Sequence, residues 1–105
     1  MPAPKAAAAT PQAVFKALGS PARLTLVRTL IEGERCVCDL VETVGLGWST
    51  TSRHLDLLRE AGVVTSEKRG QKIFYCIKLA CVADFIRCLD DTCAREPTRR
   101  RACCT

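Results

Sequence analysis

Apolar residues recur at three- and four-residue steps over most of the chain, which is the spacing of amphipathic helices. Ser20-Pro21 reads as an N-cap followed by proline at the first helical position, and Gly19, Gly33, Gly45 and Gly62 stand where the apolar stripes stop. The pattern predicts five helices, at about residues 12–18, 21–32, 38–44, 48–61 and 80–92.

The pattern changes between Gly62 and Ala80. Residues 63–68 and 73–78 are rich in Val, Ile, Phe and Tyr and flank Arg69-Gly70-Gln71-Lys72, which predicts a β-hairpin with a basic tip. We therefore expect a mainly α fold with a small β-hairpin. Its predicted organisation is a flexible leader (residues 1–11), one folded domain (12–92) and a Cys/Arg-rich tail (93–105).

Helix, helix, turn, helix and basic hairpin is the order of a winged helix-turn-helix, whose second motif helix enters the major groove while the wing touches flanking phosphates. Hydroxyls can reach phosphates or base edges, Arg53 can pair with guanine or phosphate, and wing cations can neutralise phosphates. For any single residue, an ordinary solvated surface is an equal alternative. The predicted contacts to double-stranded DNA are Ser49, Thr50, Thr51, Ser52, Arg53, Arg69 and Lys72.

Composition narrows the class of protein. The 105 residues carry a formal net charge of +5, which suits a polyanionic partner, and no apolar run is long enough to span a membrane. The Ala/Pro-rich leader lacks the apolar core of a secretory signal, so we expect a cytoplasmic protein with reduced thiols. With one histidine and no pair of Cys-x-x-Cys knuckles, structural zinc is disfavoured.

Four segments of the chain resemble the ArsR/SmtB family of bacterial metal- and metalloid-responsive repressors. They are Leu18-Gly19-Ser20-Pro21-Ala22-Arg23-Leu24, Cys36-Val37-Cys38-Asp39-Leu40, Ser52-Arg53-His54-Leu55 with Leu58-Arg59-Glu60-Ala61-Gly62-Val63-Val64, and Phe74-Tyr75. The resemblance covers about residues 12–92. It implies a homodimer joined through the first and last helices, bound to a two-fold symmetric operator and released by an effector.

Cys36 and Cys38 resemble the trivalent arsenic and antimony site of arsenical repressors and the cadmium and lead site of related ones. Residues two apart do not share a face of a helix, so Cys36 must lie just before the third helix if both thiols are to reach one ion. Arsenical repressors of the best-known pattern carry a third cysteine where this chain has Val41. The adjacent Cys103-Cys104, which can grip one soft ion, and Cys93 are therefore further candidate ligands.

The remaining cysteines are expected to have structural roles. Cys76 and Cys81 are expected in the core or an interface and Cys88 in the core. The last helix has no histidine, which disfavours the zinc, nickel or cobalt site of other family members. The spacing of Cys93 and Arg99 matches a phosphatase-like Cys-x5-Arg without the glycine-rich loop, so no enzyme is expected.

The sequence thus predicts a dimeric repressor that leaves its operator when Sb(III) or As(III) binds cysteine thiolates, with no organic cofactor. One alternative is a persulfide- or redox-sensing repressor of the same fold that uses Cys38 with Cys88. The other is a sensor of cadmium or lead. A thiol-rich metal buffer is disfavoured, because such chains lack the apolar periodicity seen here.

Overall fold

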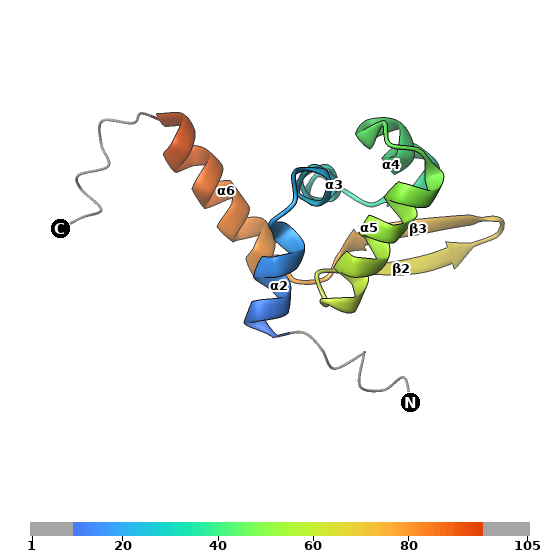
Figure 1. The fold of residues 1–105 in the computed structure, drawn as a ribbon, viewed down its shortest axis with the longest axis horizontal. Coiled ribbons are helices and arrows are strands. Elements are labelled where there is room, and N and C mark those ends of the chain that lie inside the picture. The colour runs from blue at the N-terminus through green and yellow to red at the C-terminus, as the bar shows by residue number, and fades with distance from the viewer. Residues whose placement is uncertain (1–9, 96–105) are drawn as a thin grey trace.

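The computed structural model describes residues 10–95. In chain order the elements are α2 (Pro11–Leu18), α3 (Pro21–Ile31), β1 (Arg35–Cys36), α4 (Val37–Val44), α5 (Trp48–Glu60), β2 (Val64–Arg69), β3 (Lys72–Ile77) and α6 (Ala80–Arg95). Figure 1 shows α2 against the first half of α6, and the hairpin of β2 and β3 extending on the opposite side of the molecule. The predicted mainly α, winged helix-turn-helix fold is confirmed.

The first two described helices begin where local chemistry places them. Thr10 Oγ1 accepts a hydrogen bond from Ala13 N at 3.1 Å, and Ser20 Oγ accepts one from Arg23 N at 3.4 Å. In each helix a proline takes the first position, where its missing N–H costs nothing. Helix α2 therefore begins at Pro11, with Thr10 as its cap.

The sheet has one strand more than the sequence pattern predicts. Its order is β1-β3-β2, with all pairs antiparallel, and Arg35 and Cys36 pair with Tyr75 and Phe74 of β3. A two-residue strand has no periodicity of its own, so only its pairing with β3 reveals it. β1 connects directly to α4, and the wing is therefore joined to the start of the helix-turn-helix.

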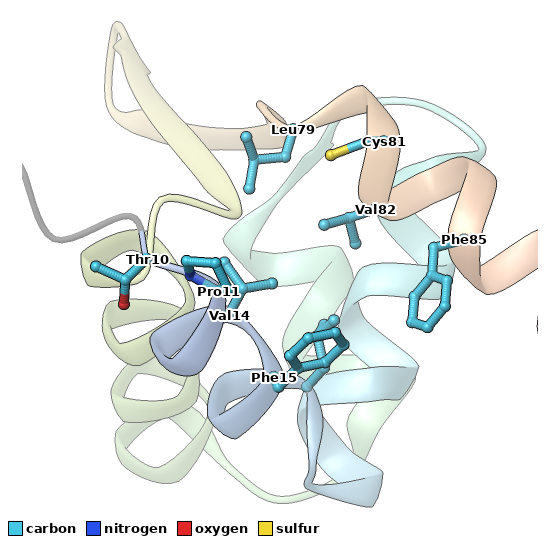
Figure 2. A pocket seen from close by; sticks show the side chains of 9 residues that line it. Thr10, Pro11, Val14, Phe15, Leu79, Cys81, Val82 and Phe85 are labelled. Carbon is cyan, nitrogen blue, oxygen red and sulfur yellow. The ribbon is translucent and has the colours of Figure 1, made fainter.

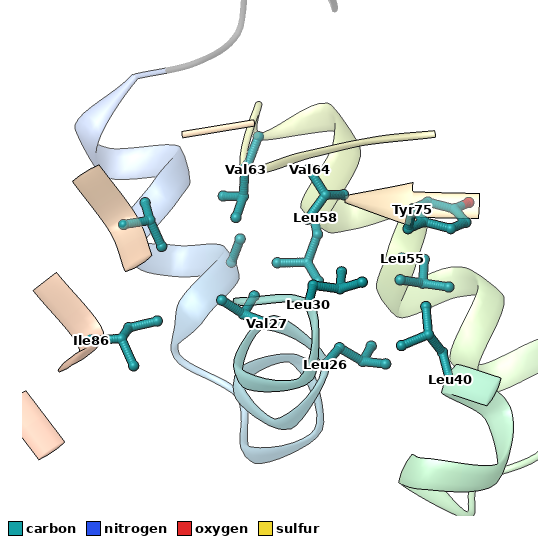
Figure 3. Packing of buried hydrophobic residues seen from close by; sticks show 13 residues of the cluster. Leu26, Val27, Leu30, Leu40, Leu55, Leu58, Val63, Val64, Tyr75 and Ile86 are labelled. Carbon is teal, nitrogen blue, oxygen red and sulfur yellow. The ribbon is translucent and has the colours of Figure 1, made fainter. Parts of the chain in front are cut away.

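The core lies between the helices and the inner face of the sheet. α3 is its centre and contributes Leu26, Val27 and Leu30, which pack between α6 on one side and α4, α5 and the sheet on the other (Figure 3). The surrounding elements contribute Leu40, Leu55, Leu58, Val63, Val64, Tyr75, Val82 and Ile86. Fully burying one such leucine side chain stabilises the fold by about 1.5–3 kcal/mol.

Helix α6 is longer than the sequence predicts. It continues to Arg95, so Cys93 lies on the helix. The helix packs on α3 through Val82 and Ile86 and is tied to it by an ion pair of Arg28 with Asp90 at 2.6 Å. No helix among residues 10–95 is long and apolar enough to cross a membrane.

Candidate DNA interface and thiol sites

The turn of the helix-turn-helix depends on two glycines. Gly45 ends α4 in the left-handed conformation with φ 73°, and its N–H donates to Val41 O at 2.9 Å. Gly47 has φ 89° and precedes α5, whose Thr51 N–H donates to Gly47 O at 3.1 Å. Residues with a Cβ seldom adopt either conformation, so the two glycines fix the angle between the helices.

The predicted recognition residues lie on both faces of α5. Ser49, Thr50, Ser52 and Arg53 are exposed, as a contact surface for DNA requires. Thr51 is fully buried, which corrects its assignment as a DNA contact. With Leu55 and Leu58 it forms the inner stripe at i, i+4 and i+7. Its neighbours Thr50 and Ser52 also carry hydroxyls, so residue type alone groups Thr51 with them. The Thr51 hydroxyl has no hydrogen-bond partner among the described residues.

The wing also departs from the prediction at one position. Lys72 is exposed, and so is Lys68, which sequence reasoning missed. Arg69 instead donates two hydrogen bonds to the Glu34 carboxylate, at 2.6 and 3.0 Å, and one to Glu67 at 2.9 Å. Its charge is thus neutralised by two acids, and the lysines are the freer phosphate donors.

His54 links the recognition helix to α3 and α2. Arg23 donates through Nη1 to His54 Nδ1 at 3.1 Å and through Nε to the Ala17 carbonyl at 2.7 Å. Partial burial, and then the positive charges of Arg23 and Arg53, lower the pKa of His54 below its usual 6.5. With its Nδ1 accepting this hydrogen bond, the neutral ring of His54 is a packing contact between α5 and α3.

The two thiols of the Cys-x-Cys motif have different surroundings. Cys36 is the N-cap residue of α4 and only 6% exposed, while Cys38 lies exposed in the first helical turn. Cys36 therefore precedes the helix, as the motif requires. Within residues 10–95, no three Cys, His, Asp or Glu side chains are grouped so that they could hold a metal ion. A site at Cys36 and Cys38 thus needs a further thiol from elsewhere.

The other candidate thiols are distributed along the chain. Cys93 is exposed near the end of α6, whereas Cys103 and Cys104 lie outside the described residues. Cys76 is half-buried on β3, with Sγ 3.4 Å from Thr65 Oγ1. Cys88 is exposed in the single chain, so its assignment to the core is wrong.

An apolar hollow separates the outer sides of α2 and α6. It has a volume of about 380 Å³ and is lined by Pro11, Val14, Phe15, Cys81 and Phe85 among others. Figure 2 shows Phe15 of α2 and Phe85 of α6 on either side of it, and their ring centroids lie 6.0 Å apart in an edge-to-face arrangement. Phe15 is 61% and Phe85 44% exposed, an uncommon exposure for two large apolar rings in contact.

A helix-turn-helix with an exposed polar recognition helix and an attached wing defines a DNA-binding transcriptional regulator. Residues 20–66 match the sequence model of the bacterial regulatory proteins of the arsR family. The chain belongs to this family, whose members are regulators and not enzymes.

Curated relatives agree with this family. The biofilm growth-associated repressor of Xylella fastidiosa is 39% identical over 84 residues, which cover 79% of this chain and 74% of that protein. The arsenic resistance transcriptional regulator ArsR1 of Pseudomonas putida is 44% identical over 63% of this chain and 52% of its own length. The cadmium resistance regulatory protein CadC of Listeria innocua is 43% identical over 61% and 55%.

Solved structures show the same fold. The repressor BigR from Xylella fastidiosa superposes with a TM-score of 0.75 at 35% identity, covering 81% of this chain and 87% of that one. A homodimeric winged helix-turn-helix domain from Mycobacterium bovis gives 0.72 at 28% identity, with 77% and 75% covered. Reduced HlyU from Vibrio cholerae gives 0.73 at 28% identity, with 80% and 88% covered.

Proposed function

We propose that this ArsR-family repressor binds its operator as a homodimer and is released when Sb(III) or As(III) binds cysteine thiolates. The observation that carries the proposal is the position of Cys36 and Cys38, which bracket the first residue of α4, the first helix of the DNA-binding motif. A soft ion that draws these two thiols together changes the start of that helix. The operator-reading helix α5 follows after a three-residue turn.

The DNA contacts follow from exposure and charge. The outer face of α5 presents Ser49, Thr50, Ser52 and Arg53 to the major groove, and Arg53 can read guanine through a pair of hydrogen bonds. Lys68 and Lys72 on the wing contribute phosphate contacts that carry no sequence information. The recognition helix therefore sets specificity and the wing adds salt-dependent affinity.

The dimer forms through α2 and α6. Phe15, Phe85 and Leu89 are exposed on these helices in the single chain, and the apolar hollow lies between them. A second subunit that covers this surface removes it from water, and a two-fold symmetric dimer then presents two recognition helices to a two-fold symmetric operator. The homodimeric winged-helix neighbour supports this assembly.

The effector site needs three thiolates. Trivalent arsenic and antimony prefer three sulfur ligands, and cysteine thiolates are the soft ligands that such ions select. Cys36 and Cys38 supply two. The third comes from Cys93 or from the pair Cys103 and Cys104, of the same subunit or of its partner. The ion must bind the weakly DNA-binding form of the dimer better than the DNA-bound form, since otherwise it cannot release the operator.

The test is fluorescence anisotropy of the reduced, full-length protein on its upstream DNA. Antimonite, arsenite, cadmium, zinc and persulfide are titrated in parallel. Release by antimonite or arsenite at concentrations where zinc has no effect supports the proposal. Release by none of the five contradicts it.

Cysteine variants then locate the ligands. The double variant Cys103→Ser/Cys104→Ser is expected to bind the operator normally and to lose release by the metalloid, whereas either single variant keeps one tail thiol. Cys76→Ser is the control, because Cys76 is a free thiol on β3, outside both the proposed ligands and the α2–α6 surface. Normal release by the double variant would exclude the tail pair and leave Cys93 to complete the site with Cys36 and Cys38.

A second candidate function is sensing of persulfide or oxidants by Cys38 together with Cys88. The observation that favours it is the exposure of both thiols in the single chain, since reactive cysteines must be accessible. In the same titration, release by persulfide alone, lost in Cys88→Ser, would establish this function. Release by cadmium alone would instead indicate a soft divalent-metal sensor.

A further inference from the structure

One arginine side chain reaches from β2 across β3 to the residue that precedes β1. Arg69 starts near the tip of β2, passes over the Phe74 ring of β3 at 4.8 Å from the ring centroid, and reaches the Glu34 carboxylate beside β1. Glu67, which pairs with Phe74 in the sheet, accepts a further hydrogen bond from it. A guanidinium held by a two-point carboxylate contact and an aromatic face has a defined direction.

The acid that receives Arg69 lies next to the thiol strand. Glu34 immediately precedes β1, which consists of Arg35 and Cys36 alone, and the backbone of Cys36 pairs with Phe74. A strand with two paired residues is weakly held by its own ladder. The Glu34–Arg69 ion pair is therefore an additional anchor for β1, the strand that contains the buried Cys36.

This contact can open while the domain stays folded. The Arg69 and Glu34 side chains are 44% and 42% exposed, so water can replace either partner without uncovering the core. Exposed ion pairs are weak compared with the whole fold, and their opening is accordingly frequent.

We propose that Glu34 is a positioning residue that ties the wing to β1, so that burial of Cys36 and orientation of the wing belong to one state. In the tied state Cys36 is covered, Arg69 lies across the sheet and Lys72 projects from a wing held in place for DNA. In the untied state Cys36 is open to a thiol ligand and the wing is free. A ligand that binds Cys36 selects the untied state and thereby weakens DNA binding.

Only the weakening of DNA binding by a ligand at Cys36 rests on the proposed function. The first test, which measures thiol labelling, does not depend on that function. The reduced, full-length protein is pulse-labelled with N-ethylmaleimide without DNA or metal, and labelling of Cys36 is measured by tandem mass spectrometry with exposed Cys38 as internal reference. Glu34→Gln removes one side of the ion pair. Arg69→Lys removes the two-point contact at constant net charge.

Both variants are expected to label Cys36 about two- to five-fold faster than the wild type, the range that an exposed ion pair supports. Glu32→Gln is the matched control, because it removes the same charge two positions away at an exposed residue. It is expected to leave labelling unchanged. Unchanged Cys36 labelling in Glu34→Gln and Arg69→Lys would overturn the proposal.

Operator affinity gives an independent readout. Glu34→Gln is expected to bind DNA more weakly than Glu32→Gln, although both variants gain the same charge. Tighter binding by Glu34→Gln would mean that Glu34 merely competes with phosphate for Arg69, and the proposal would fall. Both measurements remain decisive if no metalloid releases the wild-type protein, so failure of the proposed function and failure of the tie are distinguishable.

Discussion

The buried hydroxyl of Thr51 leads to a prediction about the stability of the protein. The exposed Thr50, on the same helix, supplies the control. Thr51 lies on the inner side of α5 with Leu55 and Leu58, and its Oγ1 has no hydrogen-bond partner among the described residues. Thr51→Val replaces that hydroxyl by a methyl group of similar size. Valine and threonine have similar helix propensities, so the backbone contributes little to the difference.

The magnitude follows from desolvation. A buried hydroxyl without a partner costs about 1–3 kcal/mol, so Thr51→Val is expected to raise the free energy of unfolding by about that amount. For a domain of this size, each 1 kcal/mol corresponds to a rise in Tm of roughly 4–8 °C. Thr51→Ser keeps the hydroxyl and removes a methyl group, and it is expected to destabilise the protein by about 1 kcal/mol.

Thr50→Val is the control, because Thr50 is exposed on the same helix. It is expected to change the unfolding free energy by about 0.5 kcal/mol or less. Urea unfolding measures the free energy of unfolding of all three variants. The protein concentration is kept the same throughout, because the stability of a dimer depends on concentration. In the anisotropy assay Thr50→Val should weaken DNA binding and Thr51→Val should not. A neutral or destabilising Thr51→Val would show that the Thr51 hydroxyl is satisfied in the folded protein.

Three further predictions concern the pH dependence, the wing and the dimer. Because the pKa of His54 is lowered in the folded state, the unfolded chain binds more protons, so stability should fall as pH drops below about 6.5 and the loss should be complete below the folded-state pKa. His54→Gln should reduce this slope in urea unfolding at pH 7.5 and 5.5, and an unchanged slope would contradict the assignment. Lys72→Ala should lower the magnitude of the slope of log affinity against log salt by about 1.8, about 0.9 for each subunit of the dimer, whereas Lys16→Ala on α2 should not; equal slopes would remove Lys72 from the interface. Phe85→Ser should shift sedimentation toward the monomer, while Leu57→Ser, with 43% exposure against 44%, should leave the dimer intact; a stable Phe85→Ser dimer would argue against the α2–α6 interface.

Local sequence signals predicted the elements and their order. Ser20 and the glycines at helix ends act through contacts within a few residues, and the apolar periods of α3 and α5 report which side faces the core. The hairpin was equally readable, because Gly70 with φ 66° begins a two-residue turn between Arg69 and Lys72. Each of these signals comes from residues within or next to the helix, strand or turn that it predicts.

The candidate site was only partly readable. Residue type placed Thr51 with its hydroxyl-bearing neighbours, although the helical period carries it to the inner stripe with Leu55 and Leu58. Cys36 and Cys38 were identified as a pair, yet one is buried and the other exposed. The burial of Cys36 depends on the tertiary structure, where its strand pairs with β3 at Phe74, a residue distant in sequence.

The sequence by itself determined the helices, the hairpin and the helix-turn-helix, because caps, glycines and periodicity act over a few residues. Only the tertiary structure decided that β1 joins the sheet, that His54 meets Arg23 and that Arg69 is held by Glu34, 35 positions away. These contacts join segments that are distant in sequence. The sequence of a hairpin fits a charged residue equally well as a phosphate ligand or as the partner of a carboxylate. Which role it has depends on whether the fold brings an acidic side chain within hydrogen-bond distance.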